Sequence, residues 1–245
     1  MTHSIVFGGS KGLGRVLARQ LAGRGDSVSV VSRSVPSPAE QVEGVSYFSA
    51  DIADASATAA ALDAAIKQNG ALDYLVFCQR YRGKENSWAG EIDVSLTASK
   101  RVIEYLQDQF SKGSDSGIVF VSSVFGDRVG EGQDISYHIG KAGMNHMARF
   151  YAVNLGRKGI RTNAVTPFTF LKEESKDFYL NNMELLQLYE EIVPLGRMAT
   201  AEDSANVITF LCSPAAAFVN GQNIYVDGGL SLVWPETLAR KLKSF

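Results

Sequence analysis

The chain has 245 residues, of which 45% are hydrophobic and 20% are charged, and its formal net charge is −2. This composition is typical of a globular protein with a sizeable core, and the charge argues against nucleic acid as a partner, because such proteins usually carry a concentrated basic surface. The two cysteines predict no disulfide framework, and the three histidines, which lack metal-ligand spacing, predict no metal. No apolar stretch approaches 18 residues, which predicts no membrane span and no signal peptide. We therefore expect a cytoplasmic protein.

Short apolar runs alternate with amphipathic segments along the whole chain. Strands are predicted at 4–8, 27–32, 45–51, 72–78, 117–123, 160–165 and 221–229, and helices at 13–25, 57–68, 90–111, 137–159 and 201–213. Apolar strands of this length separated by helices of ten or more residues are typical of βαβ units around a parallel sheet that is buried on both faces. The sequence therefore predicts an α/β fold, in which residues 1–245 form a single-domain, doubly wound Rossmann-like sheet of about seven strands with helices on both faces.

Residues 168–193 form an insertion of aromatic and acidic helical character after the sixth predicted strand. Ligands of doubly wound sheets bind outside the carboxyl ends of the strands, where this insertion begins. The segment is interpreted either as a lid over the substrate or as a helical excursion that only caps the core.

A glycine-rich turn follows the first predicted strand and opens the first predicted helix. Its glycines are spaced G-x-x-x-G-x-G, and glycines in this position allow a sharp turn and the close approach of a pyrophosphate to a helix N-terminus. Their place between a strand and a helix indicates a dinucleotide cofactor. The residues expected to bind it in this turn are Gly8, Ser10, Lys11, Gly12, Leu13 and Gly14.

The end of the second predicted strand carries a positively charged residue. An acidic residue at this place would bind the ribose hydroxyls of NAD(H) and repel a 2′-phosphate. Ser32 and Arg33 occupy this place, and Lys11 lies in the glycine turn. Two cations near the adenosine ribose favour the 2′-phosphate of NADP(H) over NAD(H). The alternative interpretation is a pair of solvated surface charges.

Tyr137 and Lys141 stand one helical turn apart in the stretch "SYHIGKAG". Tyrosine is a poor acid or base at neutral pH, because its reference pKa is about 10, but a fixed positive charge beside it favours the phenolate and lowers that pKa. The pair is therefore either a proton-transfer device or two unrelated residues on the surface of a helix.

The glycine turn, the Tyr-x-x-x-Lys pair and the chain length together resemble the short-chain dehydrogenase/reductase family over essentially the whole chain. The C-terminal part is more specific than either short motif, since "NAVTP" and the stretch "PLGRMATAEDSANVITFLCSPAAAFVNGQNIYVDGG" are similar to the family's tail. The resemblance implies an NADP(H)-dependent oxidoreductase that reduces a ketone or aldehyde to an alcohol, or catalyses the reverse reaction.

The resemblance also implies roles for individual residues. Tyr137 is expected to be the general acid or base, and Lys141 to hold the nicotinamide ribose and lower the pKa of Tyr137. Ser123 is expected to hydrogen-bond the substrate oxygen, with Ser122 as the competing candidate. The gap between Ser123 and Tyr137 is one residue longer than the family's commonest spacing, which predicts a small insertion in 124–136.

Further expectations concern the cofactor and the assembly. Asp51 and Ile52 match the family's adenine-contacting position, while Cys78 and Pro167 take cofactor-facing places. Family members usually assemble through the two helices expected at 90–111 and 137–158, so a homodimer or homotetramer is expected. The tail, "SLVWPETLARKLKSF", is expected either to pack on a neighbouring subunit or to close the sheet edge.

Several positions depart from the family pattern. Ser95 stands where the family's catalytic asparagine holds a water in a proton relay from lysine to solvent, so the relay is expected to be rearranged or slowed. The other departures follow or lie within the fourth, fifth and sixth predicted strands, and they are Cys78, Gln79, Arg80, Phe120 and Phe168. The threonine that the family has near the nicotinamide is not at its usual position, and Thr169 is the substitute considered for it.

Two interpretations of these departures remain open. In one, the enzyme is active and its site is reshaped for a particular small-molecule substrate, which Arg80 and Phe125 would contact; arginine would suit an anionic or sugar-phosphate group, such as a glycan precursor. In the other, the chain is a non-catalytic NADP(H)-binding regulatory module. The retention of Ser123, Tyr137 and Lys141 favours the active enzyme.

Overall fold

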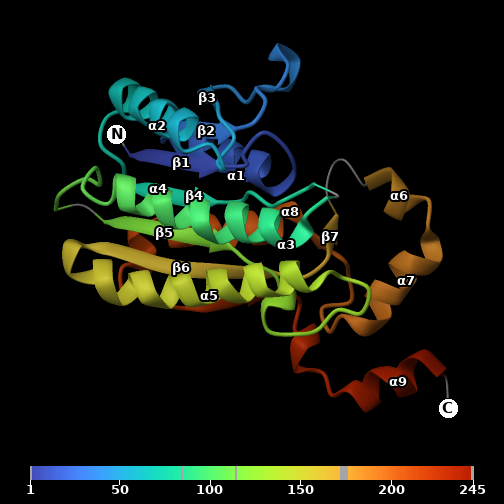
Figure 1. Ribbon diagram of the computed structural model, residues 1–245. Helices are drawn as coiled ribbons and strands as arrows, with labels where there is room; N and C mark the ends of the chain where they lie inside the picture. The colour runs from blue at the N-terminus through green and yellow to red at the C-terminus, as the bar shows by residue number, and fades with distance from the viewer. Residues whose placement is uncertain (1, 84, 114, 172–175, 244–245) are drawn as a thin grey trace.

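A parallel seven-stranded sheet forms the centre of the molecule in the computed structural model, which describes residues 2–83, 85–113, 115–171 and 176–243 (Figure 1). The spatial order is β3-β2-β1-β4-β5-β6-β9, so the order reverses between β1 and β4. The strands are β1 (His3–Phe7), β2 (Ser27–Ser32), β3 (Val45–Ser49), β4 (Tyr74–Phe77), β5 (Ser116–Val121), β6 (Ile160–Pro167) and β9 (Asn223–Val226). The predicted single-domain, doubly wound α/β fold is confirmed.

Helices cover both faces of the sheet, as the sequence predicts (Figure 1). One face packs against α2 (Ala55–Asn69), α4 (Ala98–Leu106) and α5 (Ile135–Leu155). The other face packs against α1 (Gly12–Gly23) and α8 (Ala201–Leu211). Because both faces are covered, the central strands are buried along their whole length, which explains why they are apolar runs and do not alternate with polar residues.

The predicted helix at 90–111 is three shorter segments. It begins as α3 (Ser87–Ile92), passes through a π-helical turn, η2 (Asp93–Thr97), and continues as α4, which ends at Leu106. The apolar periodicity along this stretch does not reveal a π-turn, because one extra residue in the turn changes the backbone without removing the helical pattern.

The segment after β6 lies beyond the carboxyl ends of the strands (Figure 1). It contains β7 (Phe170–Leu171), α6 (Lys176–Leu180) and α7 (Met183–Ile192), and β7 pairs with β8 (Ala199–Thr200). Residues 172–175 of the predicted insertion fall outside the described residues. The tail forms α9 (Pro235–Lys243), which packs beside α7 and lies away from the sheet edge, so it does not close that edge within this chain. Within the described ranges, no helix is long and apolar enough to cross a membrane.

A stack of three aromatic rings crosses the middle of the sheet. Phe7, Phe77 and Phe120 are register partners on β1, β4 and β5, and their ring centroids are 5.6 Å and 5.1 Å apart. Phe120 is 0% exposed. The phenylalanine at position 120, which departs from the family pattern, is therefore explained by its packing in the core.

We expect Phe120→Ala to lower the free energy of unfolding by about 3–5 kcal/mol, because it removes a buried ring and leaves a cavity. Phe218→Ala is the matched control, since Phe218 is 103% exposed, and should change stability by less than about 0.5 kcal/mol. Urea unfolding measures both. Equal effects of the two substitutions would contradict the packing assigned to Phe120.

Candidate functional site

The predicted site residues gather at the carboxyl edge of the sheet, where the strand order reverses between β1 and β4. The turn after β1, the loop after β4, the end of β5 and the start of α5 all reach this edge (Figure 1). Such a reversal opens a crevice outside the strand ends, which is where open α/β sheets bind their ligands.

Tyr137 and Lys141 lie in the first turns of α5 and face the same crevice edge. Asp134 caps this helix, and its Oδ1 accepts a hydrogen bond from the backbone nitrogen of Ser136 at 2.8 Å. The Lys141 ammonium lies 5.5 Å from the centre of the Tyr137 ring and donates to the backbone oxygen of Val121 at 2.9 Å. The two side chains therefore lie near each other, as their four-residue spacing on one helix allows.

The Lys141 ammonium is buried, with only 3% of the residue exposed. Its pKa is lowered to about 8, mainly by burial; the charge of Glu91 opposes this shift, the charge of Arg80 adds to it, and Cys78 opposes it by a smaller amount. The Arg80 guanidinium carbon lies 5.3 Å from the centre of the Tyr137 ring. Two cationic side chains therefore lie within about 6 Å of the centre of the Tyr137 ring.

Ser122 and Ser123 follow β5 and have different hydrogen bonds. The Ser122 hydroxyl is buried and donates to the backbone oxygen of Lys141 at 3.0 Å. The Ser123 hydroxyl caps the short 3-10 helix η3 (Val124–Gly126) and accepts from the backbone nitrogen of Phe125 at 3.3 Å. Ser122 therefore joins β5 to α5, while the hydroxyl hydrogen of Ser123 stays available for a ligand.

The loop between η3 and α5 is held by His138, one of the three histidines to which the sequence analysis assigned no metal site. His138 Nε2 accepts from the backbone nitrogen of Gly130 at 2.9 Å, so Nδ1 carries the hydrogen that is donated to the backbone oxygen of Asp134 at 3.0 Å. The Phe125 ring lies 5.4 Å from the His138 ring and meets the Tyr137 ring edge-on at 6.4 Å. His138 thus positions Phe125 beside Tyr137.

The glycine turn leaves no room for side chains at two of its positions. Gly8 has φ +76°, and a Cβ there would lie 2.9 Å from the backbone nitrogen of Gln79. A Cβ at Gly14 would overlap the carbonyl oxygen of Gly8. The turn therefore packs against the loop after β4 and brings the N-terminus of α1 to the crevice, where its backbone N–H groups suit a phosphate.

The residues expected at the adenosine end lie on the same sheet edge. Arg33 and Lys11 are exposed, and the Ser32 hydroxyl donates to the backbone oxygen of Ser34 at 2.9 Å. Asp51 is exposed and accepts from the backbone nitrogen of Ala53 at 3.0 Å, while Ile52 is buried. Of this group, the side chains of Lys11, Arg33 and Asp51 are open to solvent.

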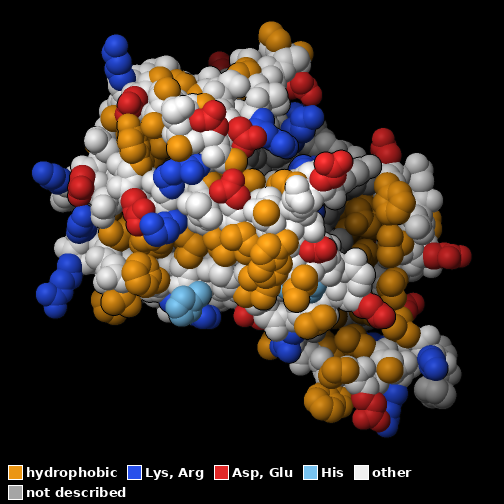
Figure 2. All heavy atoms as spheres, in the orientation of Figure 1, with side chains coloured by type: hydrophobic (Ala, Val, Ile, Leu, Met, Phe, Trp, Pro, Cys, Tyr) orange, Lys and Arg blue, Asp and Glu red, His pale blue; other side chains and the backbone are white. Residues whose placement is uncertain are grey.

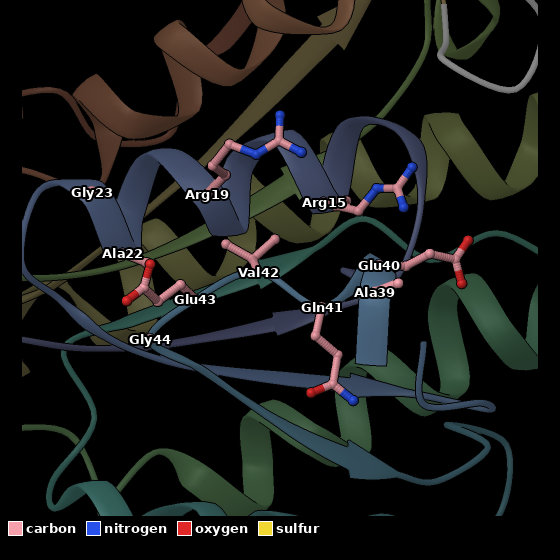
Figure 3. Close-up of a pocket in the computed structure, with 10 residues that line it drawn as sticks. All are labelled: Arg15, Arg19, Ala22, Gly23, Ala39, Glu40, Gln41, Val42, Glu43 and Gly44. Carbon is pink, nitrogen blue, oxygen red and sulfur yellow. The ribbon is translucent and has the colours of Figure 1, made fainter. Parts of the chain in front are cut away.

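A cavity of about 790 Å³ runs between α1 and loop 39–44 (Figure 3). Arg15 and Arg19 project from α1, and Glu40 and Glu43 come from the loop. The pKa of Glu40 is lowered mainly by hydrogen bonds with Ser37, with smaller contributions from the charges of Arg15 and Lys11. The cavity thus adjoins the glycine turn, but Tyr137 and Lys141 do not line it.

A second cavity, of about 80 Å³, lies under the segment after β6. Its lining includes Phe168 and Thr169, together with Tyr189 from α7 and Asp227. In Figure 2 the surface is hollowed between the body of the molecule and the arm that α6 and α7 form. The departures Phe168 and Thr169 therefore lie where the insertion meets the end of β6.

The loop after β4 carries three further departures from the family pattern. Burial raises the pKa of the Cys78 thiol to about 12, with a smaller opposing effect from Lys141. Gln79 points into the fold, and its Nε2 donates to the hydroxyl of Ser99 at 3.0 Å. Of the three side chains, Arg80 alone is exposed and directed at Tyr137.

Ser95 lies in the π-helical turn η2 and is completely buried. Its hydroxyl donates to Oε1 of Glu91, which is itself only 3% exposed. The sequence analysis singled out Ser95 but missed Glu91, although an acidic residue four positions before Ser95 on one helical face was visible in the sequence.

Comparison with known families and proteins agrees with this architecture. The family model described as Enoyl-(Acyl carrier protein) reductase matches residues 8–231. The chain is 32% identical to the 3-oxoacyl-(acyl-carrier-protein) reductase FabG of Staphylococcus aureus, over 94% of this chain and 98% of that protein. It is 28% identical to glucose 1-dehydrogenase 2 of Bacillus subtilis, over 94% of each chain.

Solved structures share the fold over nearly the whole chain. The short-chain dehydrogenase/reductase from Serratia marcescens superposes with a TM-score of 0.82 and 25% identity, covering 94% of this chain and 98% of that one. A short chain dehydrogenase family protein from Francisella tularensis gives a TM-score of 0.79 at 23% identity, covering 95% and 100%, which shows the fold alone.

Proposed function

The chain belongs to the short-chain dehydrogenase/reductase family, and on that premise we propose that it is an NADP(H)-dependent oxidoreductase that reduces a ketone or aldehyde to an alcohol, or catalyses the reverse oxidation. The observation that supports this most directly is the buried ammonium of Lys141 at 5.5 Å from the Tyr137 ring, at the crevice edge of the sheet. A phenol held beside a fixed cation is well suited to proton transfer to a carbonyl oxygen.

Tyr137 is the proton donor in this proposal. When NADPH is bound, its nicotinamide ring supplies the hydride that adds to the carbonyl carbon. The Tyr137 hydroxyl gives its proton to the carbonyl oxygen, so a C–H bond and an O–H bond form and the phenol becomes a phenolate. Lys141 and Arg80 stabilise that phenolate by their positive charge. In the oxidation direction the phenolate accepts the proton from the alcohol.

Ser123 holds the substrate oxygen. Its hydroxyl accepts from the backbone nitrogen of Phe125 at 3.3 Å, which leaves its own hydrogen for the carbonyl oxygen. Ser122 is less suited, because its hydroxyl hydrogen is already donated to the backbone of Lys141. A donor in this position stabilises the negative charge that develops on the substrate oxygen.

The glycine turn fits the pyrophosphate of a dinucleotide. The positions of Gly8 and Gly14, where a Cβ would meet backbone, keep the turn tight and expose the N-terminus of α1. The exposed cations Lys11 and Arg33 would hold the 2′-phosphate. The other residues proposed to contact the cofactor are Ser10, Gly12, Leu13, Ser32, Asp51, Ile52, Cys78, Pro167, Tyr137 and Lys141.

The substrate is proposed to be a small carbonyl compound or alcohol that contacts Arg80 and Phe125, which both lie near the Tyr137 ring. Residues 168–193 are proposed to cover it, because α6 and α7 lie beyond the strand ends (Figure 1). Arg80 favours a substrate with a negative charge or several hydroxyl groups, such as a sugar precursor.

A homodimer or homotetramer is proposed to form through α4 and α5. Large apolar side chains on these helices are exposed: Tyr105, Ile139, Phe150 and Val153 at 44%, 42%, 56% and 79%. Hydrophobic side chains gather over the same two helices in Figure 2. An exposed patch of this kind is typical of a protein interface.

The second candidate function is a non-catalytic NADP(H)-binding module, which the replacement of the family's catalytic asparagine by Ser95 favours. The two functions differ in one measurable respect. Tight NADPH binding without turnover of any carbonyl in a broad panel would support the module and contradict the enzyme.

We expect Tyr137→Phe to reduce kcat for carbonyl reduction by about 10²- to 10⁴-fold, because it removes the general acid. NADPH binding, followed by cofactor fluorescence, should be retained. Tyr74→Phe is the matched control, because the Tyr74 hydroxyl donates to Asp115 at the amino end of β4, away from the carboxyl edge of the sheet. Tyr137→Phe with the activity of the wild-type protein would disprove the assigned role.

We expect Arg33→Asp to lower the ratio of kcat/KM for NADPH over NADH by about 10- to 100-fold, since it replaces a charge-assisted contact to the 2′-phosphate with repulsion. Arg157→Asp, on the short helix after α5, is the control and should leave the ratio unchanged. Steady-state kinetics with both cofactors gives the answer. An unaltered ratio in Arg33→Asp would mean that this arginine does not select the cofactor.

A further inference from the structure

We propose that Glu91 is the buried counter-ion of Lys141, a positioning residue that keeps the Lys141 ammonium charged at neutral pH and is itself held in place by Ser95. The proposal deepens the proposed function and rests on it, because a stable charge on Lys141 matters only if Tyr137 transfers a proton.

The first observation is the burial of a carboxyl group beside the site. Glu91 is 3% exposed, although glutamate is almost never fully buried unless it is paired. It lies near the C-terminal end of α3, and a charged carboxylate in this environment carries a large desolvation penalty unless an opposite charge and hydrogen bonds compensate it. A carboxyl group buried in this way therefore depends on its neighbours for hydrogen bonds and for compensating charge.

The second observation is the way the carboxylate is fixed. The hydroxyl of Ser95, completely buried in the π-helical turn η2, donates to Glu91 Oε1. A π-turn adds one residue to a helical turn and so changes which side chain faces a site. Here it separates α3 from α4 and presents the short Ser95 hydroxyl to Glu91, in the place where the family's asparagine would otherwise reach.

The third observation is contact with the helix that carries Lys141. Gly140 immediately precedes Lys141, and a Cβ at Gly140 would lie 3.0 Å from both Cγ and Oε1 of Glu91. The Glu91 carboxylate therefore lies directly against the backbone of α5, next to the residue it would balance. The absence of a side chain at Gly140 gives the Glu91 side chain room to lie this close to α5.

The charges that face Lys141 come from three elements. Glu91 on α3 raises the pKa of Lys141, whereas burial and Arg80, on the loop after β4, lower it; Cys78, on the same loop, raises it by a smaller amount. Tyr137 faces it from its own helix. Among the described residues Lys141 and Glu91 form no direct ion pair, so the coupling acts through space in a poorly hydrated site, where Coulomb interactions are strong.

The consequence concerns the pH at which the site loses its positive charge. With a pKa of about 8, Lys141 is mostly protonated at pH 7 and loses its proton as the pH rises. Removal of the Glu91 charge lowers that pKa further, so part of the population would lose the ammonium already at neutral pH. Removal of Arg80 acts in the opposite direction.

The test is a titration of Lys141 in protein labelled with ¹³C-lysine, without cofactor or substrate, in which the Lys141 ¹³Cε signal is assigned by its absence in Lys141→Met. We expect a wild-type midpoint near pH 8. Glu91→Gln should lower the midpoint by about one pH unit or more, and Arg80→Gln should raise it. Glu104→Gln is the matched control, because Glu104 is exposed on α4 and pairs with Lys100, and it should leave the midpoint unchanged.

A midpoint that stays the same or rises in Glu91→Gln would overturn the proposal. If that variant does not fold, Glu91→Met replaces it, since it removes the charge and keeps a side chain of similar length, and its midpoint must also fall. In the pH profile of carbonyl reduction, the alkaline limb of kcat/KM for NADPH, which reports on the free enzyme, should also move to lower pH in Glu91→Gln. A purely structural role for Glu91 would lower stability and leave both midpoints in place.

The same measurements separate this inference from the proposed function. The titration needs no turnover, so an unshifted midpoint together with the expected loss of activity in Tyr137→Phe would overturn the role of Glu91 alone. A shifted midpoint in a protein that turns over no carbonyl would overturn the enzymatic function instead.

Discussion

A buried ammonium group at the edge of the sheet is the feature on which the account of this site depends. Lys141 can stay charged there only if neighbouring groups offset the loss of water. The backbone oxygen of Val121 at the end of β5 accepts one hydrogen bond, and the sulfur of Met144 lies 3.6 Å from Nζ. The remaining compensation comes from the charge of Glu91 on α3. Groups from three elements, β5, α5 and α3, therefore act on the Lys141 Nζ atom.

The topology of the sheet makes that convergence possible. Because all strands are parallel, the segments that follow β1, β4, β5 and β6 emerge at one edge. Gly8 packs against the loop after β4, and Ser122 ties the end of β5 to α5. The glycine turn and the Tyr137–Lys141 pair, which are far apart in sequence, thus become parts of one rigid frame. Differences among family members can then reside in the loops and in the segment after β6.

Much of this arrangement was predictable from local patterns. Apolar runs separated by helical segments predicted the parallel sheet, because strands that are buried on both faces consist almost entirely of apolar residues. The four-residue spacing of Tyr137 and Lys141 predicted their shared face, since helical periodicity fixes it. The roles of these residues, the cofactor preference and the lid stay predictions, which rest on the family resemblance.

Other features depend on contacts between elements that are distant in sequence, and no local sequence pattern indicates them. The stack of Phe7, Phe77 and Phe120 requires the register of three strands. The part played by His138 depends on how the loop before α5 folds back on it. The π-turn at Ser95 and the burial of Glu91 arise from the packing of α3 against α5, which the periodicity of residues 90–111 did not reveal.

The most direct test of the central claim is a crystal structure of the protein with NADPH bound. The account predicts the pyrophosphate at the turn of Gly8 and Gly14, the Lys141 ammonium on the nicotinamide ribose, and the Tyr137 hydroxyl at the edge of the nicotinamide ring. A complex in which the nicotinamide lies elsewhere, or in which the Tyr137 hydroxyl is turned away from it, would contradict the account.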